Sequence, residues 1–153
     1  MSADCWWMVE IEDPDALSGP SLGRLVQVLC SVRTMSHVAA IGVEGGGEGI
    51  NTLKEAEGFQ IVSVAEFLAD LPCVVQFDWG NFYLSDEPGR LLLLESGQPY
   101  REAILHAVVT IRAVDDTWFH VFFQDPAFLA MLDVEYPSTK KWVGPLGSMW
   151  YPE

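Results

Sequence analysis

Basic residues are scarce in this chain. Its 153 residues include 8 Lys and Arg against 22 Asp and Glu, which gives a formal net charge of −14. A negative field of this size repels nucleic acid and anionic membrane surfaces, and it attracts basic partners. The composition therefore predicts a basic protein partner and argues against direct binding of nucleic acid or membrane.

Cysteines are few, and long apolar runs are missing. The 3 cysteines, Cys5, Cys30 and Cys73, lie in apolar stretches, so we interpret them as reduced core residues of a cytosolic protein. The longest uncharged apolar run is far shorter than the roughly 18 residues that suggest a membrane span. The first residues also lack the basic and apolar regions of a secretory signal. We expect a cytoplasmic protein.

Histidines are equally few. The 3 histidines, His37, His106 and His120, are scattered, and no Cys-x-x-Cys or His-x-x-x-His spacing supports a ligand set. Hydrogen-bonded structural roles are therefore the favoured interpretation. We expect neither a metal nor a cofactor. No nucleophile elbow or zinc-protease motif is present, and we expect that the protein is not an enzyme.

Core material is abundant despite the acidity. Half of the residues are hydrophobic, and 6 Trp, 8 Phe and 4 Tyr supply large buried areas. No repeat or long linker divides the chain, so we predict a single compact acidic domain over residues 1–153. Its charge then lies on a folded surface. Composition alone leaves open whether that surface is functional or only solubilising.

The first half of the sequence alternates strand and helix patterns. We predict strands over 5–12, 37–43 and 59–62 from their β-favouring residues. Helical spacing indicates a helix from an N-cap at Ser21 to about Val32 and a short one over 52–57 capped by Asn51. A third helix, 63–71, begins with the capping box of Ser63 and Glu66.

The second half is richer in strands. Runs 73–77 and 82–84 flank a predicted turn at 78–81, and 91–94 suggests a further strand. The clearest hairpin, 103–123, turns at Asp115-Asp116 and is expected at the centre of the sheet. Asp125-Pro126 begins a helix over 127–134, and the tail from Tyr136 is expected to be irregular. The pattern predicts an α+β fold, a mostly antiparallel sheet with three to four helices packed on it.

The segment Glu44-Gly45-Gly46-Gly47-Glu48-Gly49 raises the question of a phosphate-binding loop. No Walker lysine follows it, Thr52 stands where a third Rossmann glycine would be required, and Glu44 and Glu48 would repel an anion. We interpret the segment as a mobile surface loop that no regular element includes.

Acidic and aromatic residues combine at two predicted hairpin tips. Exposed Trp and Tyr are common binding hot spots, and neighbouring carboxylates attract a basic partner. The alternative for Trp79 is that its ring folds back on the sheet. The candidate partner-binding residues are Asp78, Trp79, Asn81, Tyr83, Asp115, Asp116 and Trp118, together with Glu44 and Glu48.

In its size, acidity and mixed fold, the chain resembles the immunity proteins that bacteria pair with toxins. This resemblance implies an inhibitor that occludes the active site of a basic, nucleic-acid-acting toxin. Two alternatives stay open. One is a phage or mobile-element inhibitor that mimics nucleic acid, which requires regularly spaced carboxylates. The other is a small-ligand-binding domain or an enzyme with a pocket near the glycine-rich segment.

Overall fold

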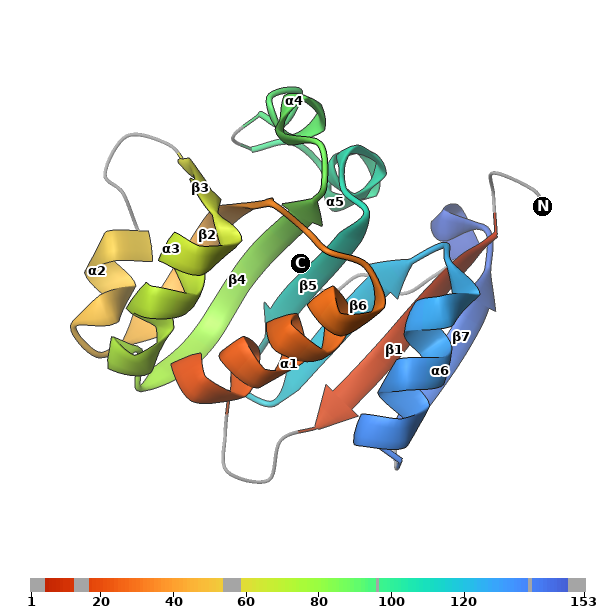
Figure 1. Ribbon diagram of the computed structural model, residues 1–153, viewed down its shortest axis with the longest axis horizontal. Coiled ribbons are helices and arrows are strands. Elements are labelled where there is room, and N and C mark those ends of the chain that lie inside the picture. Colours follow the sequence, from red (N-terminus) through yellow and green to blue (C-terminus); the bar gives the residue numbers. More distant parts are fainter. Residues whose placement is uncertain (1–4, 13–16, 54–58, 96, 138, 149–153) are drawn as a thin grey trace.

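One antiparallel sheet of seven strands runs through the molecule (Figure 1). The computed structural model describes residues 5–12, 17–53, 59–95, 97–137 and 139–148. In space the strands follow the order β3-β2-β4-β5-β6-β1-β7. The strands are β1 Trp6–Glu12, β2 His37–Gly46, β3 Ile61–Ser63, β4 Gln76–Ser85, β5 Val109–Val114, β6 Trp118–Phe123 and β7 Lys140–Gly144.

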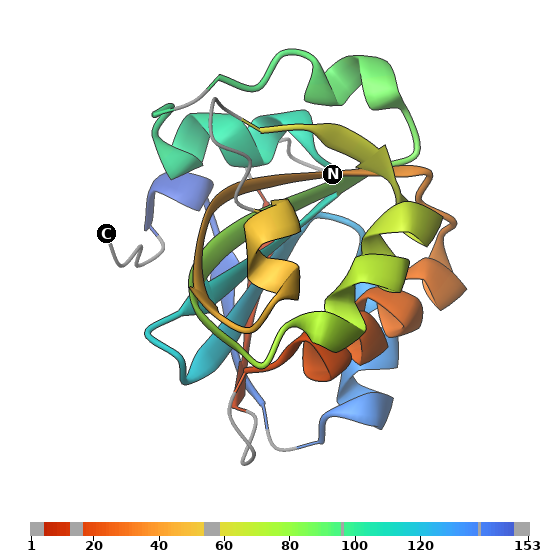
Figure 2. The same ribbon diagram turned by 90° about the vertical axis from the view of Figure 1, so that its left-hand side faces the viewer.

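Helices lie on both faces of this sheet. The front face carries the longer ones, α1 Gly19–Val32, α3 Val64–Asp70 and α6 Pro126–Glu135. Figure 2 shows α5 on the opposite side of the sheet from α1. The short elements are α2 Gly49–Leu53, η1 Leu71–Cys73, α4 Pro88–Leu91, α5 Tyr100–Ala103, η2 Ile104–His106 and η3 Leu146–Ser148. The predicted α+β class and antiparallel sheet are confirmed.

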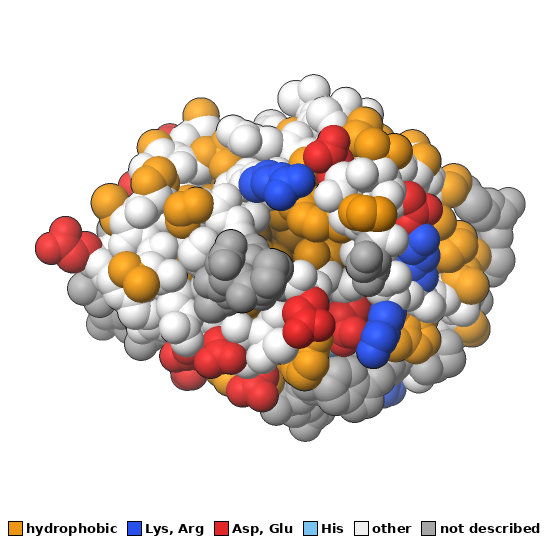
Figure 3. Space-filling view, turned by 90° about the horizontal axis from the view of Figure 1, so that it is seen from below, with side chains coloured by type: hydrophobic (Ala, Val, Ile, Leu, Met, Phe, Trp, Pro, Cys, Tyr) orange, Lys and Arg blue, Asp and Glu red, His pale blue; other side chains and the backbone are white. Residues whose placement is uncertain are grey.

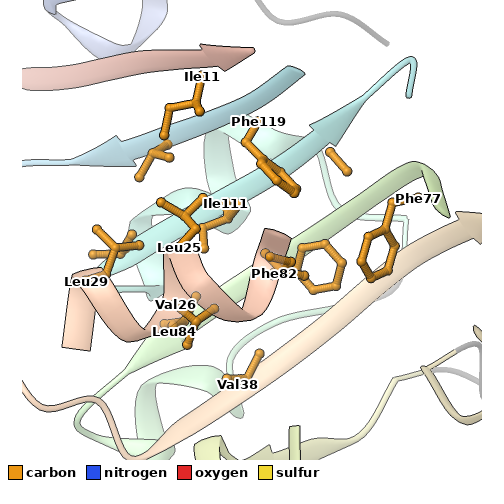
Figure 4. Packing of buried hydrophobic residues seen from close by; sticks show 14 of the residues in the cluster. Ile11, Leu25, Val26, Leu29, Val38, Phe77, Phe82, Leu84, Ile111 and Phe119 are labelled. Atoms are coloured by element: carbon orange, nitrogen blue, oxygen red, sulfur yellow. The ribbon is translucent and has the colours of Figure 1, made fainter. Parts of the chain in front are cut away.

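Each face of the sheet buries its own hydrophobic cluster, because side chains along a strand alternate between faces. On the front face, Leu25 and Leu29 of α1 lie over Phe82 and Ile111 of the sheet (Figure 4). The rear cluster joins the sheet to the segment around α4 and α5. Its buried members include Trp6, Met8, Tyr83, Leu91, Leu94, Ile104 and Phe122.

Side-chain caps fix where the three longer helices begin. The cap of α1 is Ser18 rather than the predicted Ser21: the Ser18 hydroxyl accepts from the Ser21 amide at 3.1 Å, and the Ser21 hydroxyl accepts from the Ser18 amide at 2.8 Å. The Ser63 hydroxyl accepts from the Glu66 amide at 3.1 Å at the start of α3. Asp125 caps α6, as predicted, through the Ala127 amide at 2.9 Å.

The turn predicted at 78–81 does not exist. Residues 76–85 form one strand, in which Gly80 and Asn81 pair with Ala113 and Arg112 of β5. Tertiary pairing on both sides of β4 overrides the local turn preference of Gly and Asn. The prediction that no regular element includes the glycine-rich segment is also wrong, because β2 continues through Gly46, which pairs with Gln76 of β4.

Other predicted elements differ in extent or type. Residues 91–94 are not a strand, since Leu91 is the last residue of α4. Residues 103–106 are α-helical or 3₁₀-helical, so the hairpin begins only at Val109 and does not include His106. The turn at Asp115-Asp116 and the central position of the hairpin are confirmed. The tail contributes β7, which pairs with β1. The helix predicted from Asn51 begins at Gly49, and residues 54–57 lie outside the described residues.

The cysteine interpretation holds in part. All three thiols are free, with Cys5 and Cys30 partly buried, whereas Cys73 is exposed and is not a core residue. None of the helices in the described ranges combines the length and the apolar character that crossing a bilayer requires.

Two glycines of α1 should respond to alanine in opposite directions. A Cβ on Gly19 would overlap the backbone carbonyl of Leu71, whereas one on Gly23 meets only side chains, the nearest at 3.6 Å from Leu71 Cδ1. Urea unfolding should show Gly19→Ala destabilised by about 1–3 kcal/mol or more. Gly23→Ala should gain up to about 1 kcal/mol of helix propensity. Equal effects of the two substitutions would contradict this packing of α1.

Candidate functional site

The pairing of β2 with β4 contains two bulges. Between the pairs Ile41–Asn81 and Glu44–Trp79, β2 advances three residues while β4 advances two. Between Glu44–Trp79 and Gly45–Phe77, β4 advances two residues while β2 advances one, so Asp78 has no partner on β2. A bulge bends its strand and changes the direction of nearby side chains. The first bulge lies beside Asn81, and the second contains Asp78.

Beside the second bulge, the pairing of β4 with the β5–β6 hairpin brings together carboxylates from distant parts of the sequence. The Asp78 carbonyl accepts from the backbone amide of Asp116 at 3.0 Å. The Gln76 side chain donates from Nε2 to Asp78 Oδ1 at 2.8 Å and to Asp116 Oδ2 at 3.3 Å. Two sequence candidates, Asp78 and Asp116, therefore lie at one place and share one neutral donor.

The β5–β6 turn holds Asp115 and Asp116 in an unfavourable backbone conformation. Both have φ of 50°, and the turn is closed by a 3.1 Å hydrogen bond from the Thr117 amide to the Val114 carbonyl. Positive φ at both central positions defines a type I′ turn, for which Asn-Gly is preferred. Left-handed conformations cost non-glycine residues on the order of 1 kcal/mol. The turn nevertheless carries two adjacent carboxylates at its tip.

We call this region the acidic end, made up of Glu12, Glu44, Asp78, Asp115 and Asp116. All but the half-buried Asp78 are exposed. Among the described residues, Glu135, Asp86 and Asp133 form ion pairs with basic side chains and Glu10 contacts the His120 ring, and none of these contacts uses a carboxylate of the acidic end. Figure 3, seen from below, shows acidic side chains gathered at its lower left, at the end of the molecule where β4 begins.

The aromatic candidates Trp79 and Trp118 are both half-buried. Trp79 of β4 pairs with Glu44 of β2, and Trp118 of β6 pairs with Glu12 of β1. Sequence reasoning missed Glu12, although it ends the predicted first strand. Glu48 is exposed just before α2, and no described contact joins it to the other candidates.

Asn81 and Tyr83 lie elsewhere. They are only 9% and 2% exposed, and both line a cavity of about 660 Å³ on the rear face. The prediction that these two residues lie at a hairpin tip is wrong, because residues 78–81 are part of the continuous strand β4. The structure therefore separates them from the acidic end.

A row of polar residues that the sequence analysis did not single out crosses the rear face. Directly paired positions carry Asn81 on β4, Arg112 on β5, His120 on β6 and Glu10 on β1, followed by Lys140 on β7. Arg112 Nε donates to Asn81 Oδ1 at 2.8 Å, and His120 Nε2 lies 3.1 Å from Glu10 Oε1. The clearest available signal was His120, the single polar residue of the otherwise apolar strand β6.

Burial lowers the pKa of His120 below its ordinary value. The Glu10 hydrogen bond and charge raise this pKa, and the positive charge of Arg112 lowers it further. The net direction is downward, so the imidazole is neutral at neutral pH. The fully buried charge in the row is then that of Arg112, which is 1% exposed.

Within the described residues, no group of three or more His, Cys, Asp or Glu is arranged to hold a metal ion. No protein-family model, curated protein or solved structure matches this chain. The function is therefore inferred from the arrangement of the residues in this structure.

The lowered pKa of His120 predicts a pH dependence of stability. The unfolded histidine binds a proton near pH 6.5, before the folded one does. The contribution of His120 is therefore fully present above about pH 6.5 and declines as the pH falls towards the folded pKa. Urea unfolding from about pH 7.5 to pH 5 should show a steeper loss for the wild type than for His120→Gln.

Nuclear magnetic resonance titration of the His120 ring measures the same quantity directly. The midpoint should lie below about 6.5, and it should fall further in Glu10→Gln, because the carboxylate raises it. A midpoint above that value would mean that the attraction of Glu10 outweighs burial, contrary to this account.

Proposed function

We propose that this protein is an immunity-type inhibitor that binds a basic toxin through its acidic end and blocks the toxin's active site. The observation that carries the proposal is the convergence of Asp78 and Asp116 on Gln76. These carboxylates lack a cation partner among the described ion pairs, so a partner's Lys or Arg can supply one.

The charge distribution supports fast association. A net charge of −14 produces a long-range field, and the acidic end concentrates part of that charge on one exposed surface. Such a field speeds the encounter with a positively charged cleft by about 10- to 1000-fold at low salt. A toxin that acts on nucleic acid has a cleft of this kind, because it must attract phosphates.

The half-buried rings of Trp79 and Trp118 supply apolar area beside these charges. Partly exposed Trp side chains are enriched among residues that dominate binding energy, and their loss mainly speeds dissociation. We therefore infer that the carboxylates speed association and that the two Trp rings slow dissociation. The gathering of carboxylates at one end, rather than in a regular row, favours this reading over nucleic-acid mimicry.

The direct functional test is neutralisation. The product of the gene adjacent to this one should be toxic when expressed alone and harmless when this chain is expressed with it. A pure complex of the two proteins should form at a one-to-one ratio. If the adjacent product is harmless, or stays toxic in the presence of this chain, the immunity assignment fails.

The strained turn allows binding to be separated from folding. The double variant Asp115→Asn/Asp116→Gly removes two charges while installing the residues that a type I′ turn prefers. Its free energy of unfolding should be equal to or higher than that of the wild type. Its association rate with the basic partner should fall by about tenfold or more at low salt.

A matched control removes two charges at the other end of the molecule. Glu87 and Glu102 are exposed on the α4 and α5 side, so Glu87→Gln/Glu102→Gln changes the net charge equally. Stopped-flow kinetics should show a much smaller loss for this control. Equal losses in the two double variants would mean that only net charge matters and that the acidic end is not the contact.

A further inference from the structure

The rear face holds a cavity whose described lining carries one acidic and one basic side chain, in contrast to the strong acidity of the whole chain. Its volume is about 660 Å³, within the range of small-molecule sites. It is lined by residues of β2 and β4 on one side and by residue 95 and residues from 97–103 on the other. The acidic end takes no part in it.

The first β2 bulge creates the space over Asn81. Gly42 has φ of +65°, which glycine adopts readily, and both Gly42 and Asn81 line the cavity. A Cβ on Gly42 would lie 3.6 Å from Asn81 Nδ2, so the missing side chain leaves room beside the amide nitrogen. Glycine at a strand bulge often marks a close approach to a ligand.

The buried guanidinium fixes which way the Asn81 amide points. Arg112 can only donate, and its Nε donates to Asn81 Oδ1 at 2.8 Å. The nitrogen, Asn81 Nδ2, is therefore the atom beside Gly42, and it donates to the Ile41 carbonyl over a long 3.4 Å. An NH₂ group has two protons to donate, so the cavity floor presents a donor.

Two further donors line the cavity. Gln98 is oriented in the same manner, because its Oε1 accepts from the Glu95 amide at 3.2 Å and leaves Nε2 to donate. Arg101 adds an exposed guanidinium. Glu95 is the carboxylate among the described lining residues, and it is exposed. The apolar walls are Ile41, Pro99 and Ala103.

We propose that this cavity binds a small organic oxyanion, whose head group accepts hydrogen bonds from Asn81, Gln98 and Arg101 and whose apolar body lies against Ile41, Pro99 and Ala103. Charge-assisted bonds from a guanidinium to a carboxylate or phosphate are the strongest of these contacts. The Asn81–Arg112 bond orients the Asn81 donor and the Glu95 amide orients that of Gln98 before the ligand arrives, which lowers the cost of binding. This site is independent of the inhibitor function proposed above.

The test compares probes that share one apolar body and differ in the head group: benzoate, phenyl phosphate, neutral benzamide and cationic benzylammonium. Nitrogen-proton correlation spectra resolve the side-chain amides of Asn81 and Gln98. Benzoate or phenyl phosphate should shift both resonances saturably below about 10 mM, and the tighter of the two identifies the head group. Benzamide and benzylammonium should bind at least about tenfold more weakly.

Arg101→Gln should raise the dissociation constant of the tighter anion by about tenfold, because it replaces a charged donor with a neutral one. Arg101 is exposed, so this variant should fold normally. The control Arg24→Gln removes an exposed arginine from α1 on the front face and should leave the constant unchanged. Benzamide binding as tightly as the anions, an unchanged constant in Arg101→Gln, or no shift with any probe would overturn the proposal.

Discussion

The register of β2 against β4 changes twice, and the two changes lie at the acidic end and at the rear cavity. These strands lie between the short β3 and the central β5. One change leaves Asp78 without a partner on β2, and the pairing of β4 with the β5–β6 hairpin places Asp78 beside Asp116 through a 3.0 Å backbone hydrogen bond. The other change adds a residue of β2 beside Asn81, which lines the rear cavity. Bulges bend a strand and redirect its side chains, so one pair of strands shapes both the acidic end and the rear cavity.

The polar row on the rear face protects the register of β5 against β4. Side chains alternate between faces, so a slip of one residue in β5 would move Arg112 from its bond with Asn81 into the apolar front cluster. Burying a guanidinium costs several kcal/mol of desolvation, which its hydrogen bonds offset only when the geometry is correct. A buried polar network is therefore a weak source of stability but a strong discriminator between registers. At the acidic end the unfavourable contribution is conformational, because Asp115 and Asp116 adopt left-handed backbone angles.

The sequence predicted the features that depend on local signals. Apolar periodicity located α1, β-favouring runs around Asp115-Asp116 located the β5–β6 hairpin, and capping chemistry located α3 and α6. The errors lie where tertiary pairing overrides local preference: Gly80 and Asn81 suggest a turn but lie in β4, and Gly45 and Gly46 suggest a loop but extend β2. The acidic candidates Asp78 and Asp116 could be named from composition and context. Their convergence, and the separation of Asn81 and Tyr83 from them, depends on the pairing of distant strands, which has no clear sequence signal.

We propose that the carboxylates gathered at one end of the sheet attract a basic partner. The most direct measurement is the association rate of the complex as ionic strength rises from about 0.01 M to 1 M, over which the Debye length falls from about 30 Å to 3 Å. This rate should fall steeply, by about tenfold or more, whereas the dissociation rate should change little if the two Trp rings hold the complex together. An association rate that stays constant over this range would show that the charge of −14 serves solubility alone, and it would contradict the proposed role of the acidic end.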